Sequence, residues 1–494
     1  MIDQNYQDTA HLLRRAGFGA SPDAIRAAAA TGLEAVSQSL LDGSATADSL
    51  KDDDFLDRLA ALAPENATGR LPVQAVKILW IRRMLFGPNP LVEKMTLFWH
   101  GHFTSKLGGD GSDMLAQNRI LRQHALGNFR TLTLAISRDP AMLKYLNGNQ
   151  NFKAHPNENY ARELMELFTC GIGNYTENDV KAAARAFTGW NLRMDEFDFN
   201  QRQHDDGPKT FLGKTGNWNG NDIVDMLVAH PATARRVCSQ LFMYFVHPDP
   251  TDADLAPLIA TYYNNGYDIK AVMGQMLRSP VFYADESRNS IIKCPAQFVV
   301  GTIKMLGLED AFNPSVDDVA TEAAETEQGF GRRLKTFKGA RDPKLARLAS
   351  LPVAMRSMGQ DLLAPPSVKG WDGGEAWINS STLMNRVAFG ERLAQSPALY
   401  RELARRVVSQ SANAGNADAW VSYLSEALGP LDLGPTVRDT MVAYASQPGS
   451  NLTASLTTLS PAQDGARRRP NRDQVSRYLG LLPLIMGSPE YQVC

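Results

Sequence analysis

The sequence predicts a mainly α fold, a large multi-helix globular protein with a few short strands or hairpins near residues 195–220. Apolar residues recur mostly at three- and four-residue spacing, clear alternation of apolar and polar residues is rare, and helix starts are well marked. The chain has 494 residues, of which 44% are hydrophobic, so it can bury a substantial core. We expect residues 1–494 to form one large helical domain.

Local signals set the expected helix boundaries. Ser21 and Pro22 provide an N-cap and a first-turn proline for a helix that ends at Gly32. Residues 71–104 should form helices interrupted by the GPNP sequence at 87–90. Further helical patterns cover residues 114–147, 157–170, 177–188, 221–246, 252–278 and 291–306.

Three stretches depart from this helical pattern. The glycine-rich, polar segment 195–220 favours short strands. Residues 308–346 are charged without a steady period, and residues 446–473 are rich in Ser, Thr, Gly and Pro. We expect both of these stretches to be flexible insertions at the surface.

Composition excludes several classes of protein. The formal net charge of −2 argues against nucleic acid as the main partner, because phosphate binding requires a basic face. The four cysteines stand far apart without a C-x-x-C motif, so neither a zinc ribbon nor a disulfide framework is indicated. No stretch approaches about 18 uninterrupted apolar residues, and the first residues lack the apolar region of a signal peptide. We therefore expect no membrane span and a cytoplasmic location.

The most distinctive stretch is HPNENYARELMELFTCGIGNYTENDVKAAARAFTGW, residues 155–190. Asn157 is the expected N-cap of its first helix, Gly171 ends that helix, and Thr176 with Asp179 forms a capping box for the second. Arg162 and Glu166 have the spacing of an ordinary surface ion pair. The alternatives are two well-capped helices with an acidic outer face, or a site in which carboxylates act as general acid and base. The candidate carboxylates are Glu158, Glu163, Glu166, Glu177 and Asp179.

A second candidate is FWHGHFTSK at residues 98–106. His100 and His102 would point to one side only if the backbone were extended, which Gly101 favours. They would then ligate a divalent metal, or act as acid and base beside the aromatic ring of Trp99. The alternative is that both cap a helix end.

Two loop segments are the remaining candidate sites. The GKT at 213–215 is not a phosphate-binding loop, because Pro208 stands where that motif needs glycine. Two interpretations of this segment remain. His204, Asp205 and Lys209 form a polar binding site, or the segment is simply a polar hairpin.

In PPSVKGWDGGEAWINSSTLMNR, residues 365–386, two tryptophans flank a pair of glycines. Trp371 and Trp377 could present flat faces to a sugar while Asp372 and Glu375 form hydrogen bonds. A turn packed into the core is the alternative.

These stretches, in this order, resemble the bacterial domain of unknown function 1800 family (DUF1800). The resemblance extends from HLLRRAGFG near the start through HPATARRVCSQLFMYFV to the terminal GSPEYQ. It implies a mostly helical protein, often exported, whose gene neighbours a twin-arginine-exported family similar to sulfatases and alkaline phosphatases. It also favours one shared polar pocket formed by the polar residues of the family motifs. Those residues are His100, His102, Asn157, Glu158, Asn159, Arg162, Glu163, Glu166, His204, Asp205 and Trp371.

The leading hypothesis is a hydrolase-type enzyme that acts on a polar polymer, with carbohydrate as the favoured class. Glu163 or Glu166 would be the general acid/base and Glu158 its carboxylate partner. His100 and His102 would polarise the substrate. Stacking and further binding would come from Trp99, Trp190, Trp371, Asn157, Arg162, His204, Asp205 and Lys209.

Two alternatives stand beside this hypothesis. The first is a non-catalytic binding or assembly partner of a twin-arginine-exported phosphatase- or sulfatase-like protein, which would place the chain in the periplasm by co-export. The second is a metal site formed by His100, His102, Glu158 and His204. No other cofactor is expected.

Overall fold

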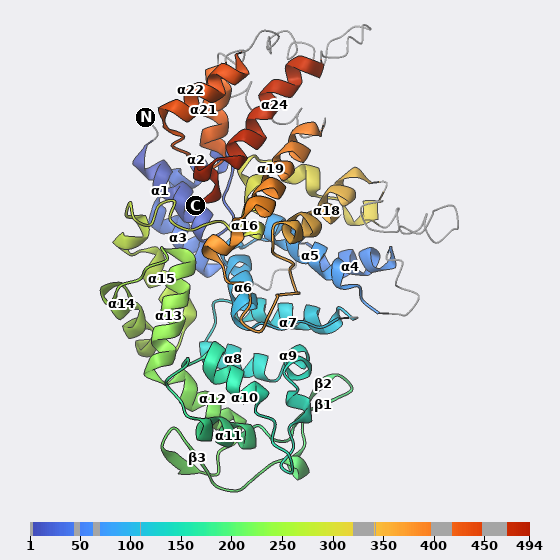
Figure 1. The fold of residues 1–494 in the computed structure, drawn as a ribbon, viewed down its shortest axis with the longest axis vertical. Coiled ribbons are helices and arrows are strands. Elements are labelled where there is room, and N and C mark those ends of the chain that lie inside the picture. Colours follow the sequence, from blue (N-terminus) through green and yellow to red (C-terminus); the bar gives the residue numbers. More distant parts are fainter. Residues whose placement is uncertain are drawn as a thin grey trace.

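A computed structural model describes residues 3–43, 50–62, 70–108, 110–319, 340, 342–396, 417–446 and 472–494. Within these ranges the chain is mainly helical, with two small antiparallel sheets, which confirms the predicted fold class (Figure 1). The predicted insertions at 308–346 and 446–473 lie largely outside the described residues. No described helix combines the length and the apolarity that crossing a bilayer requires.

The N-terminal helices begin and end where local signals place them. The Ser21 hydroxyl accepts a hydrogen bond from the Ala24 amide at 3.4 Å, and Gly32 ends the helix with a φ of 90°. The predicted interruption at 87–90 separates two helices. The first six helices are α1 (Gln4–Arg15), α2 (Pro22–Thr31), α3 (Leu33–Asp42), α4 (Asp52–Ala61), α5 (Val73–Phe86) and α6 (Pro90–His102).

The predicted helical stretch 114–147 resolves into three helices because two polar side chains cap new starts. Asn128 accepts from the Thr131 amide at 3.2 Å, and Asp139 accepts from the Met142 amide at 2.9 Å. The helices are α7 (Ser112–Gln123), α8 (Phe129–Ser137) and α9 (Pro140–Tyr145).

The chain then forms α10 (Asn159–Glu163), a π-helix (Leu164–Phe168) and α11 (Glu177–Ala186). Two hairpins follow, as the composition of 195–220 predicted, although the first begins slightly earlier. They pair β1 (Trp190–Arg193) with β2 (Glu196–Phe199), and β3 (Lys209–Phe211) with β4 (Lys214–Gly216).

The remaining helices return from the hairpin end to the opposite end of the molecule (Figure 1). They are α12 (Gly220–Val228), α13 (Pro231–Phe245), α14 (Asp252–Asn264), α15 (Ile269–Leu277), α16 (Pro295–Met305), α18 (Pro343–Ser357), α19 (Ser380–Gln395), α21 (Ala417–Ala427), α22 (Gly434–Ala445), α24 (Arg472–Gly487) and α25 (Pro489–Gln492).

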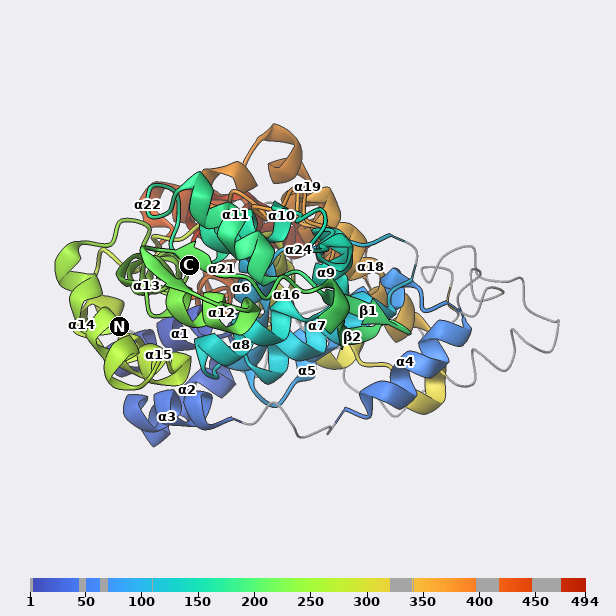
Figure 2. The same cartoon turned by 90° about the horizontal axis from the view of Figure 1, so that it is seen from below.

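Buried apolar side chains form two large cores. The first, which includes Trp80, Phe298 and Trp420, draws on α5, α16, α18, α19, α21 and α24. The second, which includes Phe129 and Tyr262, draws on α8 and on α11 to α15. Helix α6 contributes to both cores and lies near the centre of the molecule in two perpendicular views (Figures 1 and 2).

The polar groups of α6 are buried with it and find partners on neighbouring helices. Glu93 accepts hydrogen bonds from Arg122 Nε at 2.6 Å, from Arg122 Nη2 at 3.0 Å and from the Trp80 indole at 3.2 Å. Both members of this ion pair are more than nine-tenths buried. The pair therefore joins α6 to α5 and α7 where water cannot replace a lost partner.

We predict that Glu93→Ala destabilises the protein by about 3–5 kcal/mol, because it leaves the Arg122 guanidinium buried without its counter-charge. Asp225→Ala is the matched control, since Asp225 forms a similar pair with Arg130 that is nearly half exposed and should cost about 1 kcal/mol or less. Urea unfolding monitored by circular dichroism measures both. Equal costs for the two variants would contradict the role assigned to Glu93.

Candidate functional site

The second half of the central motif is structural, as the sequence indicated. The Thr176 hydroxyl accepts from the Asp179 amide at 3.2 Å, and the Asp179 carboxylate accepts from the Thr176 amide at 2.8 Å. Gly171 has a φ of +83°, a conformation that favours glycine. The capping box and the glycine stop are confirmed.

The first half departs from a regular helix. Asn157 Oδ1 accepts from the Asn159 amide at 3.0 Å, but the N-cap position falls one residue later than predicted, at Glu158, whose side chain makes no capping hydrogen bond. The helix then widens into a π-helix at Leu164–Phe168. π-Helical turns are rare and occur frequently at functional sites, so this segment remains a candidate functional site.

Arg162 organises two of the carboxylates. It pairs with Glu158 at 3.1 Å and binds Glu177 with two nitrogens, at 2.7 and 2.8 Å. The predicted pairing of Arg162 with Glu166 is therefore replaced, because Glu177 is brought alongside by the turn between the helices. Glu166 instead accepts a hydrogen bond from the Tyr175 hydroxyl at 3.2 Å.

Glu163 differs from these neighbours. Its half-buried carboxylate has no hydrogen-bond or ion-pair partner among the described residues. Burial, followed by the charge of Glu166, raises the pKa of Glu163, and the charges of Arg162 and Lys369 oppose this rise. Of the three predicted catalytic glutamates, Glu163 is the one whose carboxyl group is available for proton transfer.

The expectation of an extended backbone at His100 and His102 is wrong, since α6 runs through both residues. Tertiary packing outweighs the helix penalty of Gly101, which is about 1 kcal/mol. His100 Nε2 accepts from the Leu363 amide at 3.1 Å, whereas His102 Nε2 donates to the Phe168 carbonyl at 3.0 Å. The two imidazoles thus carry their protons on different nitrogens and make contact with different segments.

Burial lowers the pKa of each of these histidines to about 4, so both imidazoles are neutral near pH 7. They do not form the metal site considered from the sequence. His100, His102, Glu158 and His204 are not brought together, and among the described residues no group of three or more His, Cys, Asp or Glu side chains could hold a metal ion.

The polar side chains of His204, Asp205 and Lys209 form hydrogen bonds and ion pairs with other groups of the protein. His204 Nδ1 donates to the Thr188 carbonyl at 2.8 Å, and Asp205 binds Arg185 through both oxygens, at 2.7 and 3.2 Å. The Lys209 ammonium donates to the Gly207 carbonyl at 2.9 Å. These contacts hold in place the segment that leads from β2 into β3, as expected of a structured polar hairpin region.

Two of the three tryptophans expected to stack on a ligand are enclosed by protein. Trp99 is fully buried, and its indole donates to the Ala125 carbonyl at 2.9 Å. Trp190 is 5% exposed and packs edge-on against Phe187 and Phe197. The stacking role predicted for both residues is therefore wrong, because each belongs to the second core.

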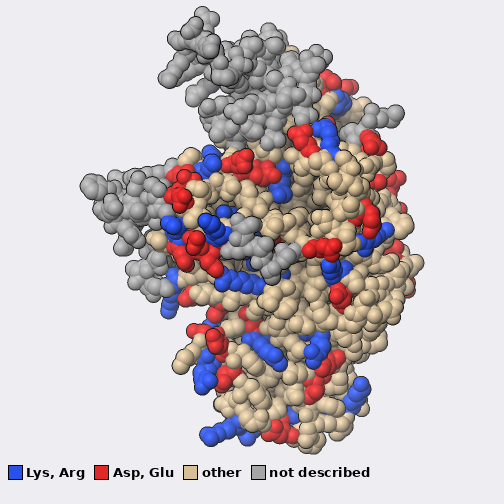
Figure 3. All heavy atoms as spheres, turned by 180° about the vertical axis from the view of Figure 1, so that it is seen from behind, with Lys and Arg blue, Asp and Glu red and all other residues tan. Residues whose placement is uncertain are grey.

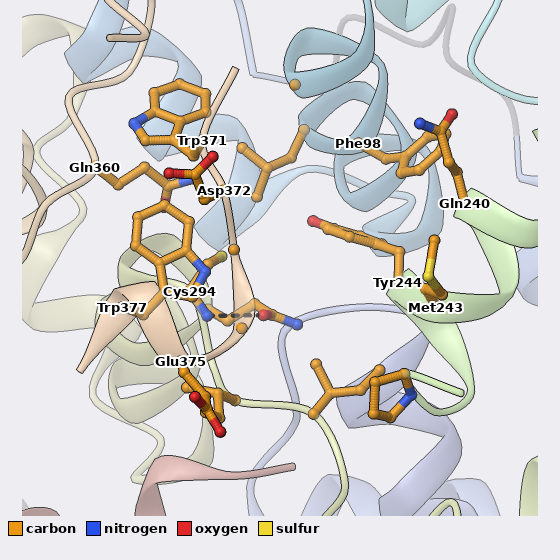
Figure 4. A pocket seen from close by; sticks show the side chains of 18 of the residues that line it. Phe98, Gln240, Met243, Tyr244, Cys294, Gln360, Trp371, Asp372, Glu375 and Trp377 are labelled. Carbon is orange, nitrogen blue, oxygen red and sulfur yellow. Dashed lines mark hydrogen bonds between the residues drawn. The ribbon is translucent and has the colours of Figure 1, made fainter. Parts of the chain in front are cut away.

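Trp371 is half-buried and lines a cavity of about 610 Å³. The cavity lies where the two cores meet, at the C-terminal end of α6. Figure 4 shows Trp371, Trp377 and Asp372 along one wall, with Phe98 and Tyr244 across the space from them. Charged and polar groups of the lining are His102, Gln240, Gln297, Gln360, Lys369, Asp372 and Glu375.

Glycines shape the tryptophan wall of the cavity. A side chain at Gly370 would place its Cβ 2.6 Å from the Gly101 carbonyl oxygen, so only glycine lets this loop contact the end of α6. Gly373 and Gly374 follow with φ values of 74° and 52°. The His100 ring lies behind the wall, 5.6 Å from the ring of Trp371.

The opposite wall comes from residues that the sequence reasoning did not single out. Gln240, Met243 and Tyr244 lie on α13, and Gln297 lies on α16. The Tyr244 hydroxyl is buried and has no hydrogen-bond partner among the described residues, and its ring lies across the cavity from the tryptophan wall (Figure 4). The only available signal was that the family-like motif HPATARRVCSQLFMYFV contains both Gln240 and Tyr244.

Comparisons with known proteins bear on the family alone. The family model described as "Protein of unknown function (DUF1800)" matches residues 11–493, nearly the whole chain. No curated protein and no solved structure matches.

We predict a pH dependence of stability from His100. As pH falls from about 6.5 to about 4, the unfolded imidazole binds a proton that the folded one does not, so stability falls by up to about 3 kcal/mol. His100→Asn keeps an acceptor for the Leu363 amide and removes this loss. Urea unfolding at about pH 7 and about pH 4.5 measures the difference, with His155→Asn as the exposed control. A pH slope in His100→Asn equal to that of the unaltered protein would refute the prediction.

Proposed function

We propose that this chain, which belongs to the DUF1800 family of proteins of unknown function, binds a carbohydrate-type polymer in the cavity at Trp371 and hydrolyses it by carboxylate acid/base chemistry. The observation that carries the proposal is the combination of aromatic faces and free carboxylates on one wall. Asp372 and Glu375 follow Trp371, the half-buried ring available for stacking, whereas Trp377 backs this wall and packs into the first core (Figure 4). Sugar rings combine an apolar face, which stacks on indole, with equatorial hydroxyls that need polar partners.

The size and lining of the cavity support this binding role. A volume of about 610 Å³ falls within the range of small-molecule sites, about 300–1,000 Å³. Gln240 and Tyr244 lie across the cavity from the tryptophan wall and add polar and aromatic surface to the lining (Figure 4). Ligand sites also occur preferentially where two packed units meet, which is where this cavity lies.

The catalytic assignment changes from the one made on the sequence. Glu158 is held by Arg162 and Glu166 by Tyr175, so neither is the favoured proton donor. We assign the general acid role to Glu163, whose raised pKa favours the protonated form. Glu163 itself is not among the residues that line the cavity, but the charge of Lys369, which does line it, acts on the Glu163 carboxylate.

The second carboxylate is assigned to Asp372, which is exposed at the cavity wall and forms no ion pair with a described residue. In glycoside hydrolysis one carboxylic acid protonates the leaving oxygen while a carboxylate activates water or attacks the sugar. His102 also lines the cavity, but its neutral imidazole is held by the Phe168 carbonyl and by Gln240, so we assign it a role in shaping the lining.

We predict that Trp371→Ala weakens binding of a soluble oligosaccharide by about tenfold or more, because a stacking face is lost, equivalent to about 1.4 kcal/mol. Titration of intrinsic fluorescence with a panel of oligosaccharides gives the affinity. Trp218→Ala is the matched control, since Trp218 is a half-buried tryptophan of the hairpin region outside the cavity lining. Unchanged affinity in Trp371→Ala would place the ligand elsewhere.

We also predict that Glu163→Gln lowers hydrolysis of the bound oligosaccharide by about 100-fold or more while affinity stays within about twofold, because only the transferable proton is removed. Glu177→Gln provides a carboxylate change on the neighbouring helix, and its activity should stay close to that of the unaltered protein. Release of reducing ends measures the reaction.

Full activity in Glu163→Gln would overturn the assignment of the acid. The competing proposal is a non-catalytic assembly partner of a phosphatase- or sulfatase-like protein exported by the twin-arginine route. A stable stoichiometric complex with such a protein, together with no hydrolysis that depends on Glu163, would favour that proposal and a periplasmic location.

A further inference from the structure

A group of buried cations lies beside the cavity and is not used by the proposed reaction. It consists of Arg14 and Arg15 from the end of α1, Lys94 from α6, Lys293 before α16 and Arg386 from α19, here called the cationic cluster. Arg15 and Lys293 are 1% and 3% exposed, and Lys94 and Arg386 have no exposed surface. Arg14 is partly exposed, but its Nη1 atom is buried.

The members of the cationic cluster act on one another. Burial, with the added charge of Arg15, lowers the pKa of Lys94 to about 8. Burial likewise lowers the pKa of Lys293 to about 7, and the charges of Arg14 and Arg386 contribute. Arg386 also donates to the Lys293 carbonyl at 2.8 Å. Five like charges thus share one poorly solvated region, an arrangement that costs free energy unless negative charge is supplied.

No carboxylate side chain among the described residues supplies that charge, and the opposing charge that acts on Arg14, Arg15, Lys94 and Lys293 comes from Cys494. The hydrogen bonds of the cluster are to neutral oxygens: Lys94 donates to the Gly17 carbonyl at 3.0 Å, Lys293 to the Tyr491 carbonyl at 2.7 Å, and Arg15 to the Ser290 hydroxyl at 2.9 Å.

Several N–H groups of the cationic cluster also lack a hydrogen-bond acceptor among the described residues. Nε and Nη1 of Arg15, Nη1 of Arg14 and Nε of Arg386 are buried and have no hydrogen-bond partner among the described residues. Buried donors of this kind ordinarily have partners, because an unmade bond costs about 1–3 kcal/mol.

The space beside the cluster connects it to the large cavity. A second cavity of about 10 Å³ is lined by Arg14, Phe18, Lys293, Gln297, Met305 and Cys494. Gln297 lines both cavities, and Ser290, which binds Arg15, lines the large one. The Lys94 ammonium lies 5.6 Å from the ring centre of Tyr244, on the wall of the large cavity.

The pKa of the Cys494 thiol indicates that the electrostatic potential in this space is positive. Burial alone would raise its pKa, but the charges of Arg15, Lys94, Lys293 and Arg14 lower it below the usual value. A negative charge is therefore favoured among these side chains even without contact to water.

We propose that the cationic cluster is a binding site for one small anionic group, either a free halide such as chloride or the carboxylate of a ligand seated in the large cavity. The volume of the second cavity, about that of one water-sized sphere, selects a monoatomic ion or a single carboxylate over a bulkier anion. Of the unpartnered guanidinium groups, that of Arg14 lines the second cavity and can donate a hydrogen bond through Nη1, and the Lys293 ammonium lies on the same lining. This site does not depend on whether the protein hydrolyses carbohydrate.

Thermal denaturation of the full-length protein at constant ionic strength tests the site. Replacing a bulky sulfonate salt by sodium chloride or by sodium glucuronate should raise the melting temperature by about 2 °C or more, because a ligand that binds only the folded state stabilises it. Glucose is the neutral control for glucuronate. A shift with chloride identifies a free ion, and a shift with glucuronate but not glucose identifies a carboxylate carried by the ligand.

Two variants distinguish anion binding at the cationic cluster from a general effect of salt on the melting temperature. Lys94→Met should abolish the shift, and it should fold because an uncompensated buried charge is removed. Lys304→Met is the matched control, since Lys304 also donates to a main-chain carbonyl, that of Leu85 at 2.8 Å, but lies outside the cluster. It should keep the full shift.

Anomalous diffraction from crystals of the unaltered protein soaked in bromide gives a result that needs no variant. We expect a bromide peak between Arg14, Lys293 and Cys494. No shift with either anion and no such peak would overturn the proposal and indicate that the charge is matched within the chain, for instance by the Cys494 thiolate. An equal shift in Lys94→Met would also overturn it.

Discussion

The rest of the structure depends on the complete burial of α6 between two cores. Nearly every residue of this helix is buried, including Glu93, Lys94, Thr96, His100 and His102. Each of these polar groups requires a partner away from water. Thr96 donates to the Val92 carbonyl within α6, and the partners of the other four come from other segments of the chain. They include the Arg122 side chain, the carbonyls of Gly17 and Phe168, and the Leu363 amide. These bonds fix the two cores relative to each other.

The cavity follows from this arrangement. Helix α6 ends between the cores, and the tryptophan loop packs on its last turn because Gly370 allows backbone contact with Gly101. One side of the cavity is therefore formed by helices α6, α13 and α16, while the exposed groups Asp372 and Glu375 lie on the loop and the short 3-10 helix (Gly374–Trp377) before α19. This division is common in binding sites, where a stable scaffold of regular elements positions the loop residues that bind the ligand. On one visible face, by contrast, acidic and basic side chains are interspersed (Figure 3).

Helix limits could be predicted because their causes are local. Ser21, the Thr176 capping box and the proline at residue 90 act within a few residues of the boundary they set. The π-helix at 164–168 has no comparable local signal, since packing around Phe168 and Leu164 in the second core accommodates the wide turn.

The candidate site was predicted less completely because its geometry is tertiary. The sequence identified Trp371 and Asp372, but the same reasoning could not tell a tryptophan facing a cavity from Trp99, whose ring is enclosed. Arg162 prefers Glu177, fifteen residues away, to the helical neighbour Glu166, because the turn brings Glu177 beside it. Gln240, Tyr244 and Gln297 join the site only through the docking of α13 and α16.

The central claim is that the cavity between the two cores is the ligand site. A crystal structure of the protein soaked in a mixture of neutral and acidic oligosaccharides tests this most directly. The account predicts density for a sugar ring against the Trp371 indole, with hydroxyls near Asp372 and Tyr244. Sugar density at another surface, with none in the cavity at saturating concentration, would contradict it.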